Sequence, residues 1–169
     1  MRTEEAVRTR RTHKAYGPDP VPRETVRELV ELATWAPNHK LTNPWRFRLV
    51  GPGALDRLKA AAGPVDAVKL DRAPTLLAVT VVRDPDPAVA EEDRDATAVA
   101  AYLVLLVAHA RGLAGYWRTP GVLRTPAGRA ALGLAGDEQI VGLLYLGHPR
   151  QEVRAPERAP VDAVLTVLD

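Results

Sequence analysis

Three short polar segments carry the residue types that could do chemistry in this chain. The first segment brings together three cations and a hydroxyl, on Arg10, Arg11, Lys14 and Thr12. Arginine offers a planar fork of N–H donors and threonine an O–H, so this set can hold a phosphate group. The alternative interpretation is a helix C-terminus, where cations interact favourably with the helix dipole.

The second segment, residues 36–45, is a loop with a polar middle that contains His39. Trp35 lies just before the loop and Trp45 ends it. Loops of this composition can line a site for a planar ligand. The alternative is an ordinary surface loop whose tryptophans pack in the core.

The third segment, residues 112–119, contains the closely spaced Gly112 and Gly115 and ends in Arg118 and Thr119. Glycines let a ligand approach the backbone, and the arginine and threonine offer a second phosphate-type contact. A helix that is capped at Gly112 and followed by a strand is an alternative, and it is compatible with the first interpretation.

Several common catalytic patterns are absent from the sequence. It contains no glycine-rich dinucleotide fingerprint, no phosphate-binding P-loop and no G-x-S-x-G nucleophile elbow. No two of the four histidines are spaced as a short metal-binding motif, so no metal site is expected. Because there is no cysteine, disulfides, thiolate catalysis and cysteine-ligated metals are excluded, and any redox chemistry would need a bound cofactor.

The length of 169 residues predicts a single domain over residues 1–169. Its 46% apolar and 26% charged composition is ordinary for a globular protein. The net charge of +2 comes without a dense block of basic residues, so nucleic-acid binding is only weakly indicated. No secretory signal is visible at the N-terminus, and the longest apolar run, residues 96–110, is shorter than the roughly 20 residues needed to span a bilayer. We therefore expect a cytoplasmic protein.

Hydrophobic periodicity and breakers predict the elements that must position these segments. Helices are expected at residues 3–10 with Thr3 as the cap, at 22–36, from Gly53 to about 62, at 88–112 and at 126–132. Strands are expected at residues 45–50, 75–82, 114–117 and 139–146. This order predicts an α+β or α/β sandwich with helices on both faces of a sheet.

Two predicted elements point to contacts beyond a simple core. The second part of the helix at residues 88–112 is apolar on nearly every face, which indicates a central position in the protein or in a dimer interface. Residues 149–160 contain three prolines and cannot form a regular helix. The apolar residues 161–168 that follow could pair with a strand of their own subunit or of a partner.

Taken together and in this order, the segments resemble the FMN-dependent nitroreductase family, and most of all its short bacterial members named as NAD(P)H nitroreductases. The resemblance covers nearly the whole chain. It is carried by residues 10–12, 36–40, 44–47, 115–119 and 140–149.

The resemblance implies an α+β fold with a central mixed β-sheet flanked by helices, assembled as an intertwined homodimer with two FMN sites at the interface. It assigns the FMN phosphate and ribityl chain to Arg10, Arg11 and Thr12, where the family often has serine in place of the threonine. Lys14 matches a basic residue near the pyrimidine edge of the flavin, where a cation would stabilise the anionic reduced cofactor.

Family members of this type also bring the second loop to the cofactor from the partner subunit. His39 matches this role, and Trp35 stands where close relatives have a basic residue, so it would offer stacking rather than charge. The resemblance assigns a third cofactor segment to Trp117, Arg118 and Thr119, with Arg118 as a second phosphate ligand. Pro120 replaces an expected glycine and would stiffen this loop.

The function implied is that of an FMN-dependent oxidoreductase. Hydride passes from NAD(P)H to flavin N5 and then, by a ping-pong mechanism, to a nitroaromatic, quinone or similar flat acceptor. No side chain is expected to act as an acid, because the flavin carries the chemistry. Three alternatives stay open: a flavin-binding or storage protein without fast turnover, a family member with other flavin chemistry such as dehydrogenation or flavin breakdown, and, more weakly, a basic nucleic-acid-binding module.

Overall fold

The structure is a computed structural model that describes residues 1–168. Helices and strands follow one another along the chain in an alternating order. The elements are α1 (Thr3–Thr9), α2 (Arg23–Ala33), η1 (His39–Leu41), β1 (Trp45–Leu49), α3 (Pro52–Leu70), β2 (Thr75–Val82), α4 (Pro87–Ala110), β3 (Ala114–Arg118), η2 (Gly121–Arg124), α5 (Pro126–Ala131), β4 (Glu138–Gly147) and η3 (Val161–Ala163). The four predicted strands and the five predicted α-helices are all present, with shifted ends.

The four strands form one sheet in the order β1-β2-β4-β3, and every pair of neighbouring strands is antiparallel. The α+β class is confirmed, but the sheet is not mixed in the way expected. Among residues 1–168, parallel pairing is limited to an isolated bridge between Thr12 and Gly115. Residues 161–168, which were expected to be able to pair with a strand of their own subunit or of a partner, form no strand within the described part of the chain.

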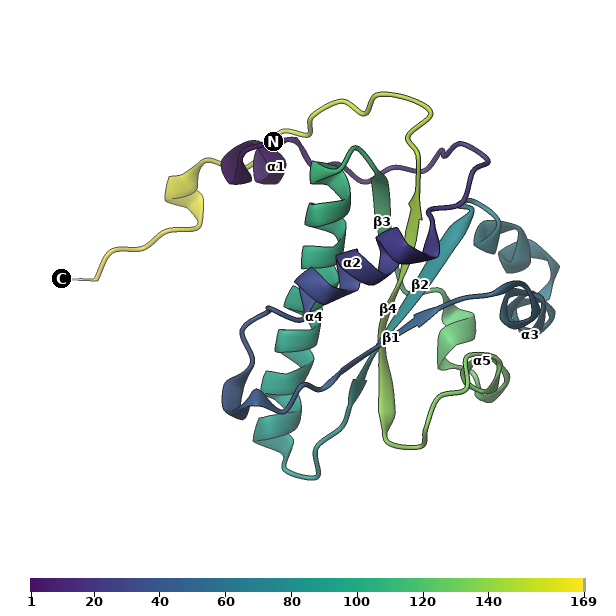
Figure 1. The fold of residues 1–169 in the computed structure, drawn as a ribbon. Helices are drawn as coiled ribbons and strands as arrows, with labels where there is room; N and C mark the ends of the chain where they lie inside the picture. The colour runs from purple at the N-terminus through teal and green to yellow at the C-terminus, as the bar shows by residue number, and fades with distance from the viewer. Residues whose placement is uncertain (169) are drawn as a thin grey trace.

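Helices cover both faces of the sheet, as the order of elements predicts (Figure 1). One face packs against α2 and α4, through buried residues that include Leu29, Val79 and Val104. The other face packs near α3 and α5, through residues that include Leu58 and Tyr145. The central strand β2 is buried on both faces, which explains why its sequence is almost continuously apolar.

Two helices differ from the expectation at their ends. Thr3 is the first residue of α1 rather than its cap, and Arg2 takes the cap position, where its backbone N–H donates to Glu5 Oε2 at 3.3 Å. Helix α3 continues past residue 62 to the buried Leu70, through a kink where Gly63 has a φ of +70° and is followed by Pro64. A left-handed glycine and a proline are both ordinary ends of a helix, so the sequence alone favours a stop there.

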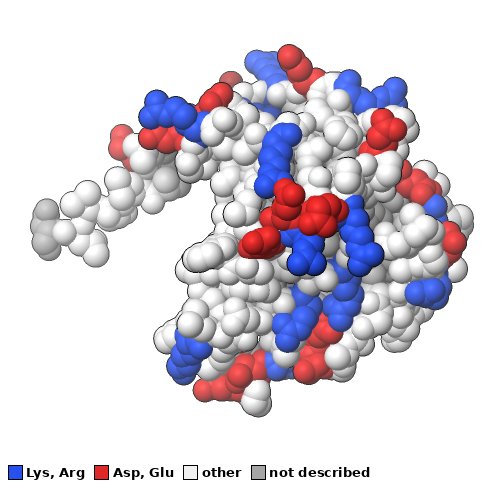
Figure 2. Space-filling view, viewed as in Figure 1, with Lys and Arg blue, Asp and Glu red and all other residues white. Residues whose placement is uncertain are grey.

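The C-terminal segment leaves the body of the molecule and runs past α1 (Figure 1). Its apolar side chains are exposed, with Val164 at 79% and Leu168 at 89%. Residues 163–168 of this segment contain no charged side chain. Acidic and basic side chains lie next to one another over α2 (Figure 2). None of the helices within residues 1–168 is long and apolar enough to cross a membrane.

Candidate cofactor site

The first polar segment lies along the edge strand β3. The backbone N–H of His13 donates to the carbonyl of Gly115 at 3.2 Å, next to the bridge between Thr12 and Gly115. Arg11 donates from Nη1 to the carbonyl oxygens of Arg8 and Arg10, at 2.7 and 2.9 Å. Arg11 therefore caps the C-terminus of α1, which is the alternative that the sequence offered for this segment.

Arg10 is not tied to the backbone in this way. Its guanidinium carbon lies 5.9 Å from the ring centroid of Tyr102 on α4, a cation–π arrangement that leaves the N–H donors available. Lys14 and Thr12 are exposed, and neither side chain forms a hydrogen bond or ion pair within residues 1–168. Three of the four side chains predicted for this segment thus keep their polar groups free for a ligand.

Two histidines border the same segment. Thr9 Oγ1 lies 2.8 Å from His109 Nε2, and both residues line a pocket of about 560 Å³ with Arg11 and His13. Burial, and then the positive charges of neighbouring groups, lower the pKa values of His13 and His109. Both imidazoles are therefore neutral near pH 7, and the positive charge at this site comes from arginine and lysine.

His109 was not predicted as a site residue. It belongs to residues 107–112, at the end of the helix that the sequence predicts to be apolar on nearly every face. The structure divides this stretch, because Ala108 is fully buried while His109 and Gly112 line the pocket. One feature of the sequence could have identified His109 as a site residue: it lies in the last turn of the predicted helix, directly before the segment that contains Gly112 and Gly115.

Arg118 projects from β3 toward the face of the sheet that α3 and α5 cover. Its guanidinium carbon lies 5.6 Å from the ring centroid of Tyr116 and 5.8 Å from that of Tyr145. Arg118 Nη1 and the Tyr145 hydroxyl are both buried and lie near each other, but within the described residues neither forms a hydrogen bond of good geometry. A buried donor without a partner costs free energy, so an acceptor such as a phosphate oxygen fits this position.

The neighbours of Arg118 in the predicted segment behave differently. Trp117 points to the opposite face, packs in the core and donates from Nε1 to the carbonyl of Val141 at 3.2 Å. Only its backbone is therefore placed to meet a ligand at the edge of β3. Thr119 is exposed and forms no side-chain hydrogen bond within residues 1–168.

The second predicted loop lies at the other end of α4. His39 Nδ1 is 3.0 Å from Glu92 Oε2, whereas His109 stands 17 residues further along the same helix. At a rise of 1.5 Å per residue, Glu92 and His109 are about 25 Å apart along α4. Trp45 is buried, as the structural interpretation of the loop expects, but Trp35 is 83% exposed. Within one chain the structure thus separates His39 from the predicted site residues at β3, and it leaves Trp35 exposed just after α2.

The residues at β3 fit the phosphate-bearing cofactor that the sequence predicts. Arg10 and Arg118 offer guanidinium donors, Thr12 offers a hydroxyl, and Arg118 carries a buried N–H without a partner. The fold and this edge define an α+β protein whose edge strand carries an arginine with a buried, unpartnered N–H group.

Comparison with known proteins agrees with this class. The model of the nitroreductase family matches residues 7–65. YfhC of Bacillus subtilis, named for NAD(P)H nitroreductase activity, is 25% identical over 92% of this chain and 88% of its own. The 5,6-dimethylbenzimidazole synthase of Rhodospirillum rubrum is 31% identical over 88% of this chain and 82% of its own. The chain belongs to the nitroreductase family.

Solved structures share the fold over the whole chain. The nitroreductase-like protein of Bacillus cereus superposes with a TM-score of 0.90 at 25% identity, covering 100% of this chain and 97% of the other. A Desulfovibrio desulfuricans protein described as a nitroreductase in complex with FMN superposes with a TM-score of 0.82 at 24% identity, covering 99% and 97%.

Proposed function

We propose that the protein is an FMN-dependent oxidoreductase that takes electrons from NADH or NADPH. The observation that carries this proposal is the buried, unpartnered Nη1 of Arg118 on the same edge strand that binds residues 12 and 13. Family membership supports it, as do relatives whose names specify NAD(P)H nitroreductases and a neighbour in complex with FMN.

The side chains at β3 would hold the cofactor by its charged end. Arg10, Thr12 and Arg118 would donate to the phosphate and the ribityl chain, with Arg10 on the α4 side of β3 and Arg118 on the side that α3 and α5 cover. Lys14, which is exposed at the end of this segment, would supply a cation near the flavin ring. Because His13 and His109 have lowered pKa values, they add no proton donor at pH 7, which fits a site whose residues bind and orient rather than transfer protons.

When bound, FMN would supply hydride transfer between NAD(P)H and a flat acceptor such as a nitroaromatic or quinone, in a ping-pong sequence. The pocket of about 560 Å³ that Thr9, Arg11, His13 and His109 line would receive the donor and the acceptor in turn. A second candidate is flavin chemistry on another substrate class, which the similarity to a 5,6-dimethylbenzimidazole synthase favours.

A homodimer completes this site. His39 is paired with Glu92, which lies about 25 Å along α4 from His109, so His39 would reach a cofactor at the β3 edge only in a partner subunit. Trp35, which is exposed, would join it there. Exposed apolar side chains are available for such an interface on α4, at Val99 and Tyr102, and on the C-terminal segment, at Val164 and Leu168. Burying them between two copies would remove apolar surface from water.

The first experiment is the visible absorption spectrum of the protein with added FMN after desalting, followed by anaerobic addition of NADH or NADPH. Retained flavin that bleaches with either donor supports the oxidoreductase, and re-oxidation by different acceptor classes then distinguishes the two candidates. Retained flavin that does not bleach points to a storage protein. Loss of all flavin on the column would overturn the proposed cofactor.

The dimer is tested separately by sedimentation of the full chain and of a variant that ends at Pro156. We expect the full chain to sediment as a dimer at micromolar concentration and the shortened chain to dissociate at least tenfold more readily. A far-UV spectrum confirms that the shortened chain is folded. A monomeric full chain would contradict the shared site.

A further inference from the structure

A buried carboxylate on α4 anchors the loop that carries His39. Asp93 is only 4% exposed and accepts hydrogen bonds from Thr42 Oγ1 at 2.5 Å and from Asn38 Nδ2 at 3.5 Å. Within residues 1–168 it forms no ion pair with Lys, Arg or His. A buried carboxyl group whose side-chain partners are two neutral donors of one loop is uncommon, because buried acidic residues are usually paired with a cation.

The backbone of this loop is held in a conformation that its residues do not favour. Lys40, Leu41 and Asn43 have φ angles of +56°, +52° and +49°. Asparagine tolerates the left-handed region, but lysine and leucine seldom adopt it because their Cβ meets the following carbonyl oxygen. Leu41 is also 77% exposed, so no packing of its side chain explains this conformation. Such strain persists only where surrounding contacts determine it, and it is concentrated at functional sites.

The contacts that determine it converge on Asp93. Asn38 Oδ1 accepts from the backbone N–H of Asn43 at 2.7 Å, and Asn38 Nδ2 also donates to Thr42 Oγ1 at 3.0 Å. These bonds close the loop on itself, and Asp93 joins the closed loop to α4. Asp93 is itself fixed, because Thr97 Oγ1 donates to its carbonyl oxygen at 2.8 Å. A carboxylate has no donor, so both loop side chains must point their donors at it.

We propose that Asp93 is a positioning residue that holds residues 38–43 in the shape that presents His39 to the cofactor of the partner subunit. This inference rests on the proposed function and on the shared site. Asp93 does not touch the cofactor in this arrangement and acts through Thr42 and Asn38. The strained loop is thereby formed before the cofactor binds, which reduces the ordering that binding would otherwise require.

The anchor is tested first without flavin, by amide hydrogen exchange of Asp93→Ala, with Asp95→Ala as the matched control. Asp95 is on the same helix, is exposed and forms no side-chain bond within residues 1–168. We expect exchange of the amides of residues 38–43 to rise at least tenfold in Asp93→Ala and to stay unchanged in Asp95→Ala. The amides of β2 serve as the internal reference for global opening.

Thr42→Val provides a second variant that keeps the shape of the side chain and removes only the hydroxyl. It answers the same question if Asp93→Ala does not fold. Unchanged exchange of the loop in folded variants of both positions would show that Asp93 is not the anchor.

The second readout is the FMN dissociation constant, measured by fluorescence quenching of FMN itself. We expect a rise of at least fivefold for Asp93→Ala and Thr42→Val, with recovery in Asp93→Asn because its amide oxygen still accepts from Thr42. A freed loop with unchanged FMN affinity would overturn the proposal that the anchor serves the cofactor. If the unaltered protein binds no FMN, the proposed function fails, and the exchange measurement still decides whether Asp93 anchors the loop.

Discussion

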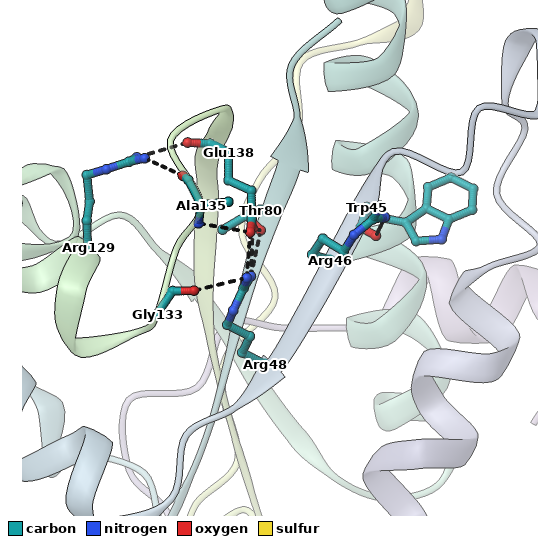
Figure 3. A network of polar contacts seen from close by, with 8 residues as sticks. All are labelled: Trp45, Arg46, Arg48, Thr80, Arg129, Gly133, Ala135 and Glu138. Atoms are coloured by element: carbon teal, nitrogen blue, oxygen red, sulfur yellow. Dashed lines mark hydrogen bonds and ion pairs between the residues drawn. The ribbon is translucent and has the colours of Figure 1, made fainter.

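Arg48 on β1 reaches across β2 to Glu138 at the start of β4 and binds both of its carboxylate oxygens (Figure 3). Nη1 lies 2.7 Å from Oε2 and Nη2 lies 2.5 Å from Oε1. Thr80 on the intervening strand donates its hydroxyl to the same carboxylate, and Arg129 of α5 donates to the Glu138 carbonyl at 2.9 Å. Because Glu138 is only 5% exposed, this pair connects three strands in a place with little water.

Replacement of Glu138 by glutamine should destabilise the fold. The change removes the charge that Arg48 faces and leaves its half-buried guanidinium without an anion, which we expect to cost about 2 kcal/mol in unfolding free energy, less than for a fully buried pair. Urea denaturation followed by circular dichroism measures this loss. Asp137→Asn is the control, because Asp137 is adjacent and exposed. A Glu138→Gln variant as stable as the control would show that the pair contributes nothing.

The same pair predicts a pH dependence. The hydrogen bond from Arg48 lowers the pKa of Glu138 to about 2, from an ordinary value of 4.5. The unfolded chain therefore binds this proton at a higher pH than the folded chain. The stabilisation is fully present above about pH 4.5 and is lost as the pH falls through about 2. The difference in unfolding free energy between the unaltered protein and Glu138→Gln should be constant from pH 7 to 5 and should shrink below pH 4.5. A difference that persists unchanged at pH 3 would contradict the assigned pKa.

Replacement of Gly142 by alanine should disturb the core through Trp117. A Cβ built on Gly142 overlaps the indole at Nε1 and Cδ1, and Trp117 cannot withdraw without losing its hydrogen bond to Val141. We expect a loss of about 2 kcal/mol in unfolding free energy, as for other overpacked cores. Gly136→Ala is the control, because nothing lies within 4 Å of its Cβ. The penalty should be smaller in a Trp117→Leu background, and an equal penalty there would exclude the indole as its cause.

Replacement of Arg118 by methionine should weaken FMN binding while preserving the fold. The change keeps an apolar stem beside Tyr116 and Tyr145 and removes the buried donor that has no protein partner. Loss of a charge-assisted hydrogen bond to phosphate should raise the FMN dissociation constant about ten- to a hundredfold. Arg124→Met, at an exposed position of η2, should leave it unchanged. Equal affinities in the two variants would remove Arg118 from the site.

Much of the local structure follows from the sequence. The continuous apolar run of β2 and the periodicity of α2 and α4 predict these elements because the pattern of burial repeats with the geometry of the element. The polar segments at residues 10–14 and 112–119 meet at β3, as a common site requires. The kink in α3 was not predictable, because Gly63 and Pro64 end most helices, and only the burial of Leu70 beyond them continues this one.

The sequence by itself determined the class of fold, the helices on both faces of the sheet and the residue types of a phosphate site, since these depend on local periodicity and chemistry. Only the tertiary structure decided which of those side chains are free. Arg11 caps a helix, Trp117 fills the core beside Gly142, and Arg118 keeps an unpartnered donor. It also placed His39 beside Glu92, far from β3, and brought Asp93 against Thr42. Contacts between residues distant in sequence depend on how the packed elements meet, and no short window of sequence contains that information.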